Sequence, residues 1–257
     1  MSAPSIPAEP YTGAAESRHN SFGQPIGSPV PGWTARARPT RRVLAGSYCR
    51  LEPVSVARHG ADLYASYAEA ADDRDWTYLF AERPQTRAQL DEYLGQLARS
   101  DDPLHFAIID GASDTALGTA ALLRIEPAHG VIEVGAIAFA RRLQRTRVGS
   151  EAIFLLMRLV FDELGYRRFE WKCDSLNAPS RAAAERYGFS FEGIFRRAIV
   201  YKGRNRDTAW YALIAEDWPR VKAAFESWLQ PDNFAADGRQ QRSLRELRAS
   251  TPSVRAG

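Results

Sequence analysis

The chain has 257 residues, of which 45% are hydrophobic and 25% are charged, and its formal net charge is +3. This composition is typical of a globular protein with one substantial core plus terminal extensions, and a charge this small gives no ground for a nucleic-acid partner. Two cysteines, Cys49 and Cys173, are too few for a disulfide framework and favour a reducing compartment. Neither a secretory signal nor a run long enough to cross a membrane is visible, so we expect a cytoplasmic protein without membrane contact.

The N-terminal residues 1–42 differ in composition from the rest of the chain. Seven of the 15 prolines lie here, and Gly, Ser and Ala are frequent. Such a segment buries too little apolar surface to fold alone, so we expect a flexible arm. The aromatic and proline residues from Phe22 to Trp33 leave a second possibility, an extended segment that lies across the domain. After Pro231 the chain is polar and rich in arginine, which predicts a frayed helix or solvated tail over residues 232–257.

Strand-like and helix-like patterns alternate over residues 43–231, which we predict to form one domain. The spacing of Leu63, Tyr67 and Ala70 predicts a first helix, and Thr86 is a suitable N-cap for a second. The expected helices lie at residues 57–70, 86–100, 150–164, 177–187 and 215–229. The expected strands lie at residues 47–56, 103–110, 116–127, 130–140 and 167–174, followed by a hairpin over 190–214 with Gly203 in its turn. Helices mixed with antiparallel-type strands in one domain indicate the α+β class.

One unit combines the strand at 130–140, a basic loop, and a helix that ends at Gly165. The apolar residues of the helix recur at intervals of three and four, as expected of a largely buried helix: Ile153, Leu156, Met157, Val160, Phe161 and Leu164. A buried strand that leads into a buried helix directs the free helix N-terminal amides at one point, which favours an anion. Arg145 and Arg147 add positive charge there. An ordinary connection with solvated arginines explains the same features.

Three motifs in order carry a resemblance to one family. The spacing Gln144-x-x-Arg147-x-Gly149 resembles the Q/R-x-x-G-x-G/A coenzyme A loop of the GNAT acetyltransferases. The segment "NAPSRAAAERYGF", residues 177–189, resembles the N-x-x-S-x-x-x-x-E-x-x-G-F pattern of the RimJ/RimL-like, ribosomal-protein N-acetyltransferase branch, as does the hairpin "YKGRNRDTAWYAL". The resemblance covers about residues 43–230. It implies the GNAT (acyl-CoA N-acyltransferase) fold, with a mixed central sheet of about seven strands flanked by helices.

The activity implied by the resemblance is direct transfer of an acetyl group from acetyl-CoA to a primary amine, without a metal. The acceptor is either a protein N-terminus or a small-molecule amine, and the protein is a monomer or a homodimer. Three positions depart from the family pattern: Arg147 replaces a loop glycine, Ala184 replaces a tyrosine acid, and Ile199 replaces an acidic residue. If the Arg147 position requires a positive φ, its side chain costs about 1 kcal/mol or more. A catalytically weak CoA-binding regulatory or interaction module therefore stays open as the alternative.

The resemblance also implies which residues bind the cofactor. Backbone groups of the central strand lie beside the pantetheine and thioester, although the same residues suit plain core packing. Asn177 is expected to cap a helix and to contact the pantetheine arm. The expected cofactor-binding residues are Ile137, Ala138, Phe139, Gln144, Arg145, Thr146, Arg147, Val148, Gly149, Ser150, Asn177 and Ser180.

Two side chains are candidates for proton transfer. Glu133 lies among apolar residues of the central strand, where burial raises a carboxyl pKa and suits it to act as a base through water. The alternatives for Glu133 are a solvent-facing strand residue or an anchor for the substrate ammonium. Ser180 matches the serine of the branch motif, and its hydroxyl would stabilise the departing thiolate. The alternative for Ser180 is a helix cap.

Three further residues are expected on the acceptor side. Trp76 and Tyr78 follow the first helix, in the region that walls the acceptor site of GNAT folds, although core packing explains these rings as well. Asp207 on the hairpin is the third, and with Glu170 and Asp174 it is also a weaker candidate for the base.

Overall fold

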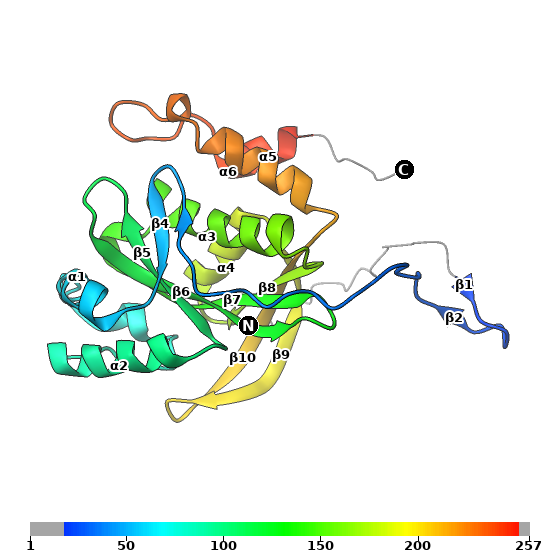
Figure 1. The fold of residues 1–257 in the computed structure, drawn as a ribbon, viewed down its shortest axis with the longest axis horizontal. Coiled ribbons are helices and arrows are strands. Elements are labelled where there is room, and N and C mark those ends of the chain that lie inside the picture. The colour runs from blue at the N-terminus through cyan, green and yellow to red at the C-terminus, as the bar shows by residue number, and fades with distance from the viewer. Residues whose placement is uncertain (1–17, 252–257) are drawn as a thin grey trace, which may run out of the picture. The chain divides into compact units, whose positions relative to one another are not determined.

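The computed structural model describes residues 18–251 and divides the chain into two compact units, Met1–Thr34 and Ala35–Gly257 (Figure 1). In the first unit, β1 (Arg18–His19) and β2 (Pro25–Ile26) form a short antiparallel pair with exposed residues. The predicted arm falls largely in this unit, and its residues 1–17 lie outside the described residues.

The last part of the predicted arm belongs to the second unit, because hydrogen bonds attach it to the domain. The Arg36 N–H donates to the Pro127 carbonyl at 3.0 Å. Further along, Arg41 Nη2 donates to the Ser100 carbonyl at 2.7 Å. The division after Thr34 therefore precedes the predicted boundary at residue 42.

The second unit is built on one eight-stranded sheet, in the order β3-β4-β5-β6-β7-β8-β10-β9. Its strands are β3 (Leu44–Ala45), β4 (Cys49–Pro53), β5 (Leu104–Asp110), β6 (Ala116–Glu126), β7 (Val131–Phe139), β8 (Arg168–Asp174), β9 (Ser190–Tyr201) and β10 (Arg204–Ile214). Neighbouring strands are antiparallel except β7 and β8, which are parallel. A parallel pair needs a crossover connection, and the long helix predicted from sequence supplies it. The expected mixed sheet is confirmed, with the two-residue β3 as an unpredicted addition.

Helices cover both faces of this sheet (Figure 1). They are α1 (Val56–Ala68), α2 (Arg87–Arg99), α3 (Arg147–Arg158), α4 (Ala178–Tyr187), α5 (Trp218–Trp228) and α6 (Leu244–Ser250). Two predicted boundaries are confirmed: Thr86 forms a capping box with Gln89 at the start of α2, and Gly188 ends α4 at φ 102°. The predicted helix before Gly165 continues past α3 as a π-helical turn, Leu159–Glu163.

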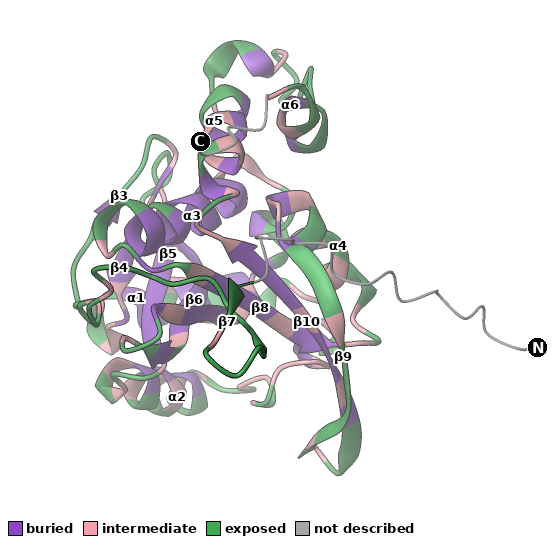
Figure 2. Cartoon of the chain, turned by 90° about the vertical axis from the view of Figure 1, so that its right-hand side faces the viewer, coloured by how far each residue is buried: buried purple, intermediate pink, exposed green. Residues whose placement is uncertain are grey.

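Two hydrophobic clusters, one on each face, hold the layers together. Leu122 and Ile132 from the sheet pack with Leu156 of α3 and Phe225 of α5, whereas α1 and α2 pack against the opposite face through a separate cluster. Burial is greatest in the middle strands and α3, and β9 at the sheet edge is mostly exposed (Figure 2). The sheet between β6 and β8 is thus enclosed on both faces.

The C-terminal region, predicted as a frayed helix or a solvated tail, contains a packed helix. Residues 231–251 fold onto α4 and α5, and α6 begins with a capping box formed by Ser243 and Glu246. Leu244 and Leu247 are buried, and Arg248 donates to the Arg186 carbonyl at the end of α4 at 2.8 Å. Two leucines on one face were enough to bury this helix, although its overall composition is polar.

The burial of α6 predicts that Leu244→Ala lowers the free energy of unfolding by about 2–4 kcal/mol, because the deletion leaves a cavity in the core. Urea denaturation measures the change. The matched control is Val200→Ala on β9, where the side chain is 79% exposed and the expected change is within about 0.5 kcal/mol. Equal effects of the two substitutions would contradict the packing of α6.

Candidate active site

The strands β7 and β8 pair over only part of their length. Their register runs from Val131↔Arg168 to Val134↔Trp171, and beyond it both strands continue without pairing each other. The cause lies in β7, where Ala136 has a positive φ of 47° and the register to β6 shifts. A bulge of this kind bends a strand, so β7 separates from β8 and leaves an opening in the sheet.

Backbone groups of β7 face this opening. Alternate residues of a strand direct their amides to opposite sides. The Ala140 N–H donates to the Leu117 carbonyl of β6 at 2.9 Å, so Ala138, two residues earlier, also faces β6. Ile137 and Phe139 therefore face the opening. Of the three predicted strand residues, two present N–H groups there and Ala138 does not.

The loop after β7 presents a second set of free amides. The N–H groups of Arg145, Thr146, Arg147 and Val148 make no hydrogen bond to any part of residues 18–251. They are consecutive, and they sit at the N-terminus of α3, where the helix dipole adds partial positive charge. Backbone donors in this arrangement suit a phosphate group, and a pyrophosphate arm continued by an amide-containing chain fits the loop and the opening together.

The other loop residues hold this conformation. Thr146 Oγ1 accepts from the Gly149 N–H at 3.0 Å and donates to the Leu143 carbonyl at 2.7 Å. Ser150 Oγ donates to the Thr146 carbonyl at 2.9 Å, and the Gln144 side-chain amide donates to the Phe139 carbonyl at 3.2 Å. The predicted roles of Gly149 and Ser150 thus become structural, since the Gly149 amide and the Ser150 hydroxyl are already bonded within the loop.

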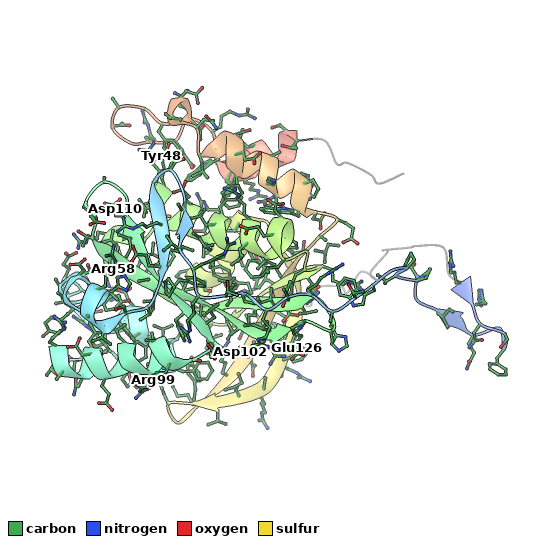
Figure 3. The ribbon with its side chains drawn as sticks, in the orientation of Figure 1. Tyr48, Arg58, Arg99, Asp102, Asp110 and Glu126 are labelled. Atoms are coloured by element: carbon green, nitrogen blue, oxygen red, sulfur yellow. The ribbon has the colours of Figure 1, made fainter. Side chains whose placement is uncertain are left out.

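Arg147 does not occupy the positive-φ position of the loop that was considered in the sequence analysis. Arg147 is the first residue of α3, and the positive φ of the loop, 61°, falls on Arg145. The Arg147 guanidinium lies 4.5 Å from the ring centroid of Tyr48 and 4.4 Å from that of Phe234. Tyr48 occupies the turn before β4 (Figure 3), and its hydroxyl donates to the Leu229 carbonyl at 2.8 Å. Arg147 therefore keeps its amide in the loop while its side chain joins two distant segments.

The turn that carries Tyr48 is held by a buried carboxylate of α3. Glu151 is 3% exposed and accepts from the N–H groups of Ser47, Tyr48 and Cys49 at 2.8, 2.6 and 2.7 Å. Three charge-assisted hydrogen bonds from backbone amides hold this carboxylate and the turn firmly together. No local pattern predicts this contact, because the donors lie about a hundred residues before Glu151.

Asn177 and Ser180 lie on the other side of the opening, after β8. The Asn177 side-chain oxygen accepts from the Ser180 N–H at 3.2 Å, which confirms the predicted cap. The Ser180 hydroxyl is not the cap; it accepts from Trp171 Nε1 at 3.0 Å. Because the indole only donates, the hydroxyl proton of Ser180 is left for another acceptor. Burial raises the pKa of the neighbouring Cys173 thiol, as expected of a packing residue rather than a nucleophile.

Glu133 belongs to a buried charge cluster on the face opposite α3. It is 6% exposed and accepts from Lys172 Nζ at 2.9 Å, while Arg124 Nε lies 3.5 Å away. Burial raises the pKa of Glu133, against the opposing effect of Lys172. Burial acts in the same direction on Glu170, but hydrogen bonds from Lys172 and Arg168 outweigh it and lower that pKa. Glu133 is therefore neither solvent-facing nor without partners, and burial and the Lys172 ammonium act on its pKa in opposite directions.

The residues expected on the acceptor side separate into three roles. The Trp76 ring is buried, with its centroid 5.4 Å from that of Tyr67 and 6.0 Å from that of Tyr93, which is core packing. Tyr78 is half-buried, and its hydroxyl donates to the Leu176 carbonyl after β8 at 3.3 Å, which places it beside the opening. The Asp207 carboxylate accepts from the Arg197 N–H at 2.7 Å and stabilises the irregular pairing of β9 with β10.

A cavity of about 550 Å³ lies between the α1–α2 connection and the turn of the β9–β10 hairpin. Lys202 Nζ closes one side by donating to the Trp76 carbonyl at 2.9 Å, and Arg204 Nη2 donates to the Thr77 carbonyl at 2.8 Å. These two basic residues thus dock the hairpin onto the α1–α2 connection.

Residues 18–251 contain no group of three or more His, Cys, Asp or Glu side chains placed to hold a metal ion. In the same part of the chain, no helix combines the length and apolar character that a bilayer crossing requires.

Comparisons with known proteins agree with this geometry. The family model described as "Acetyltransferase (GNAT) domain" matches residues 50–190. A crystal structure of a GCN5-related N-acetyltransferase from Brucella melitensis is 47% identical, with a TM-score of 0.84, and the match covers 86% of this chain and 100% of that one. A GNAT-family acetyltransferase structure from Chromobacterium violaceum is 37% identical, with a TM-score of 0.70, over 76% of this chain and 98% of that one. The Bacillus subtilis protein named "Probable N-acetyltransferase YjcK" is 28% identical over 133 residues, 51% of this chain and 72% of its own length.

The packing of the loop predicts that Gly149→Ala lowers the free energy of unfolding by about 1–3 kcal/mol. An added Cβ would lie 2.8 Å from the Leu143 carbonyl oxygen and 3.2 Å from the Phe139 ring, and the backbone contact cannot yield by a rotamer change. Gly95→Ala in α2 is the matched control, because its Cβ meets nothing closer than 3.5 Å, and it should stabilise by about 0.5–1 kcal/mol. Thermal unfolding of both variants checks the pair, and a stabilising Gly149→Ala would contradict the loop geometry.

Proposed function

Because the chain belongs to the GNAT family of acetyltransferases, we propose that it transfers an acetyl group from acetyl-CoA to a primary amine. The observation that carries the proposal is the continuous line of free backbone donors from the start of α3 into the opening between β7 and β8. A pyrophosphate can accept hydrogen bonds from the donors at the start of α3, and a pantetheine amide and a thioester can accept them from the donors in the opening.

Backbone groups provide most of the proposed cofactor contacts. The amides of residues 145–148 bind the pyrophosphate, and those of Ile137 and Phe139 face the pantetheine and thioester. Asn177 lies across the opening, where its remaining amide hydrogens are available to the pantetheine arm. Acetyl-CoA supplies the activated acetyl group, and the protein's part is to orient it and polarise its carbonyl.

Two side chains are proposed to handle protons. Glu133 accepts the proton that the amine must lose, through water, while the Lys172 ammonium keeps the carboxylate in place. As the nitrogen–carbon bond forms and the carbon–sulfur bond breaks, the Ser180 hydroxyl donates a hydrogen bond to the departing sulfur. Its fixed contact with Trp171 orients that hydroxyl. The absence of a tyrosine at Ala184 is consistent with this use of Ser180, since Ala184 is fully buried.

We further assign the chain to the RimJ/RimL-like branch, with a protein N-terminus or a small-molecule amine as acceptor. Support comes from the segment at residues 177–189, whose Asn177 and Ser180 both lie beside the opening. Tyr78 is proposed to line the acceptor path because it bridges to the segment after β8. The cytoplasmic location and the monomeric or dimeric state stay predictions from sequence.

The alternative function is a CoA-binding module with little catalysis. One of the three sequence departures that favoured it no longer supports it. Arg147 does not occupy the strained loop position, so it gives no reason to expect a damaged cofactor site. Ala184 and Ile199 remain as departures from the family pattern. Binding of acetyl-CoA without turnover across a broad amine panel would favour the module.

Acetyl-CoA is expected to raise the melting temperature in a concentration-dependent way, because a ligand that binds only the folded state stabilises it. Mass spectrometry of an amine and peptide panel incubated with protein and acetyl-CoA should then show a 42 Da addition on at least one acceptor. This is about the mass gained when an acetyl group replaces one hydrogen of an amine, as the proposed transfer requires. A flat melting temperature over the accessible concentration range would contradict the cofactor assignment.

Ser180→Ala is expected to lower kcat by about 100-fold or more, as is typical when a group that serves the leaving atom is removed. The acetyl-CoA thermal shift should be unchanged, since the proposed phosphate contacts are elsewhere. Ser180→Thr keeps a hydroxyl for both Trp171 and the sulfur and is the control, with kcat largely retained. Equal losses in both variants would indicate that Ser180 acts only in packing.

Glu133→Gln is expected to remove the acidic limb of the kcat/KM profile. A base must be ionised, so wild-type activity should fall as the pH drops through the raised pKa of Glu133. At pH 7 the variant should be about 100-fold less active. Glu170→Gln is the control, because Glu170 shares Lys172 but has a lowered pKa. An acidic limb that persists in Glu133→Gln would rule out its role as the base.

A further inference from the structure

We propose that the acceptor carries a carboxylate a few bonds from its amine, and that Arg206 binds this carboxylate. The inference rests on the proposed function and names the substrate class of the same site. Arg206 lies on β10, on the acceptor side of the sheet, and is only 7% exposed.

Arg206 has no anionic partner within the described residues 18–251. Its Nε is buried without a hydrogen bond, and no ion pair to its guanidinium is found in that part of the chain. The hydroxyl of Thr208, the next residue on the same face of β10, is also buried without a partner. A buried arginine without a counter-charge is costly to the folded protein, which points to an anion supplied by a ligand.

Two carboxylates on the strands around Arg206 bind other groups. Asp174 accepts from the Tyr201 hydroxyl at 2.8 Å and from the Leu176 N–H at 2.9 Å. Asp207, the neighbour of Arg206 on β10, accepts from the Arg197 N–H and from the Asn205 side-chain amide at 2.7 and 2.8 Å. Neither pairs with Arg206, so its charge is available to an incoming group.

Aromatic rings hold the guanidinium in place. Its central carbon lies 5.3 Å from the ring centroid of Phe80 and 5.9 Å from that of Tyr201. Phe80 is 63% exposed despite its size, so one of the two rings lies at the protein surface. A guanidinium fixed between rings presents its planar donor edge in one direction, which matches a carboxylate by two parallel hydrogen bonds.

The location of Arg206 relates this site to the opening. Thr208 is the register partner of Asp174, the last residue of β8. Arg206 is two positions from Thr208, a distance of about 7 Å along a strand. The same face of β10 carries Trp210, whose ring lies 3.8 Å from Lys172 Nζ, and Lys172 in turn binds Glu133. The opening runs along β7 and β8 from Val134 and Trp171 toward Asp174. An amine at that end of the opening and a carboxylate at Arg206 can therefore belong to one molecule that crosses this face.

The other basic side chains of the hairpin turn have different roles. Lys202 donates to the Trp76 carbonyl and to Glu82 at 2.9 and 3.0 Å, and Arg204 donates to the Thr77 carbonyl. These contacts fix the hairpin against the α1–α2 connection. Arg206, in contrast, is a buried hairpin cation that makes no ion pair within residues 18–251.

Matched acceptors test the proposal and separate two sources of the carboxylate. One arm compares free amino acids with their amides, and the other compares short peptides that differ only by Glu or Gln at the first or second position. Wild-type kcat/KM should favour the acid over the amide by about 10-fold or more in one arm, as a charge-assisted pair implies. Arg206→Met should abolish this preference, mainly through KM, and leave the amides within about twofold. Arg196→Met on exposed β9 is the control and should keep the preference.

Two outcomes would overturn the proposal: no acid preference in either arm, or a preference that survives in Arg206→Met. If no acceptor is acetylated at all, the thermal shift decides independently of turnover. In that case the acids, with CoA present, should still stabilise wild type more than their amides do, and this difference should vanish in Arg206→Met. No such difference would overturn the carboxylate site, whereas its presence would show that only the proposed transfer had failed.

Discussion

The bulge at Ala136 is the constraint on which the candidate site depends. It bends β7 away from β8 after four paired positions and turns part of a closed sheet into an opening. Backbone donors without a hydrogen-bond partner in residues 18–251 are available to a ligand that carries acceptors. Here they occur in two adjoining places, at Ile137 and Phe139 and at the start of α3. A single extended ligand with acceptors along its length satisfies both.

Apart from Arg206, the charged side chains discussed on either side of the opening are paired or held in place. Lys172 pairs with Glu133 and Glu170 on one face, and Arg147 is held between two rings on the other. In the proposed complex, backbone dipoles rather than mobile side chains bind the cofactor's phosphates. Such donors are already in position before the ligand arrives, which lowers the cost of ordering the site.

Sequence alone predicted the local features well. The cap at Thr86, the stop at Gly188 and the buried helix before Gly165 follow from short-range spacing, and each is confirmed. The features that sequence did not predict depend on distant contacts. Arg147 is explained by Tyr48 and Phe234, which lie far away on either side of it in the chain. The missing partner of Arg206 likewise becomes visible only when all neighbouring carboxylates have been placed, and the polar composition around α6 concealed two core leucines.

The most direct test of the central claim is residue-resolved amide hydrogen exchange, measured by NMR with and without acetyl-CoA. The account predicts slower exchange for the amides of residues 145–148 and of Ile137 and Phe139, with little change at Ala138, whose amide faces β6. Protection confined to other regions, or equal protection of Ala138 and its two neighbours, would contradict the claim that the free donors of β7 and α3 form one cofactor site.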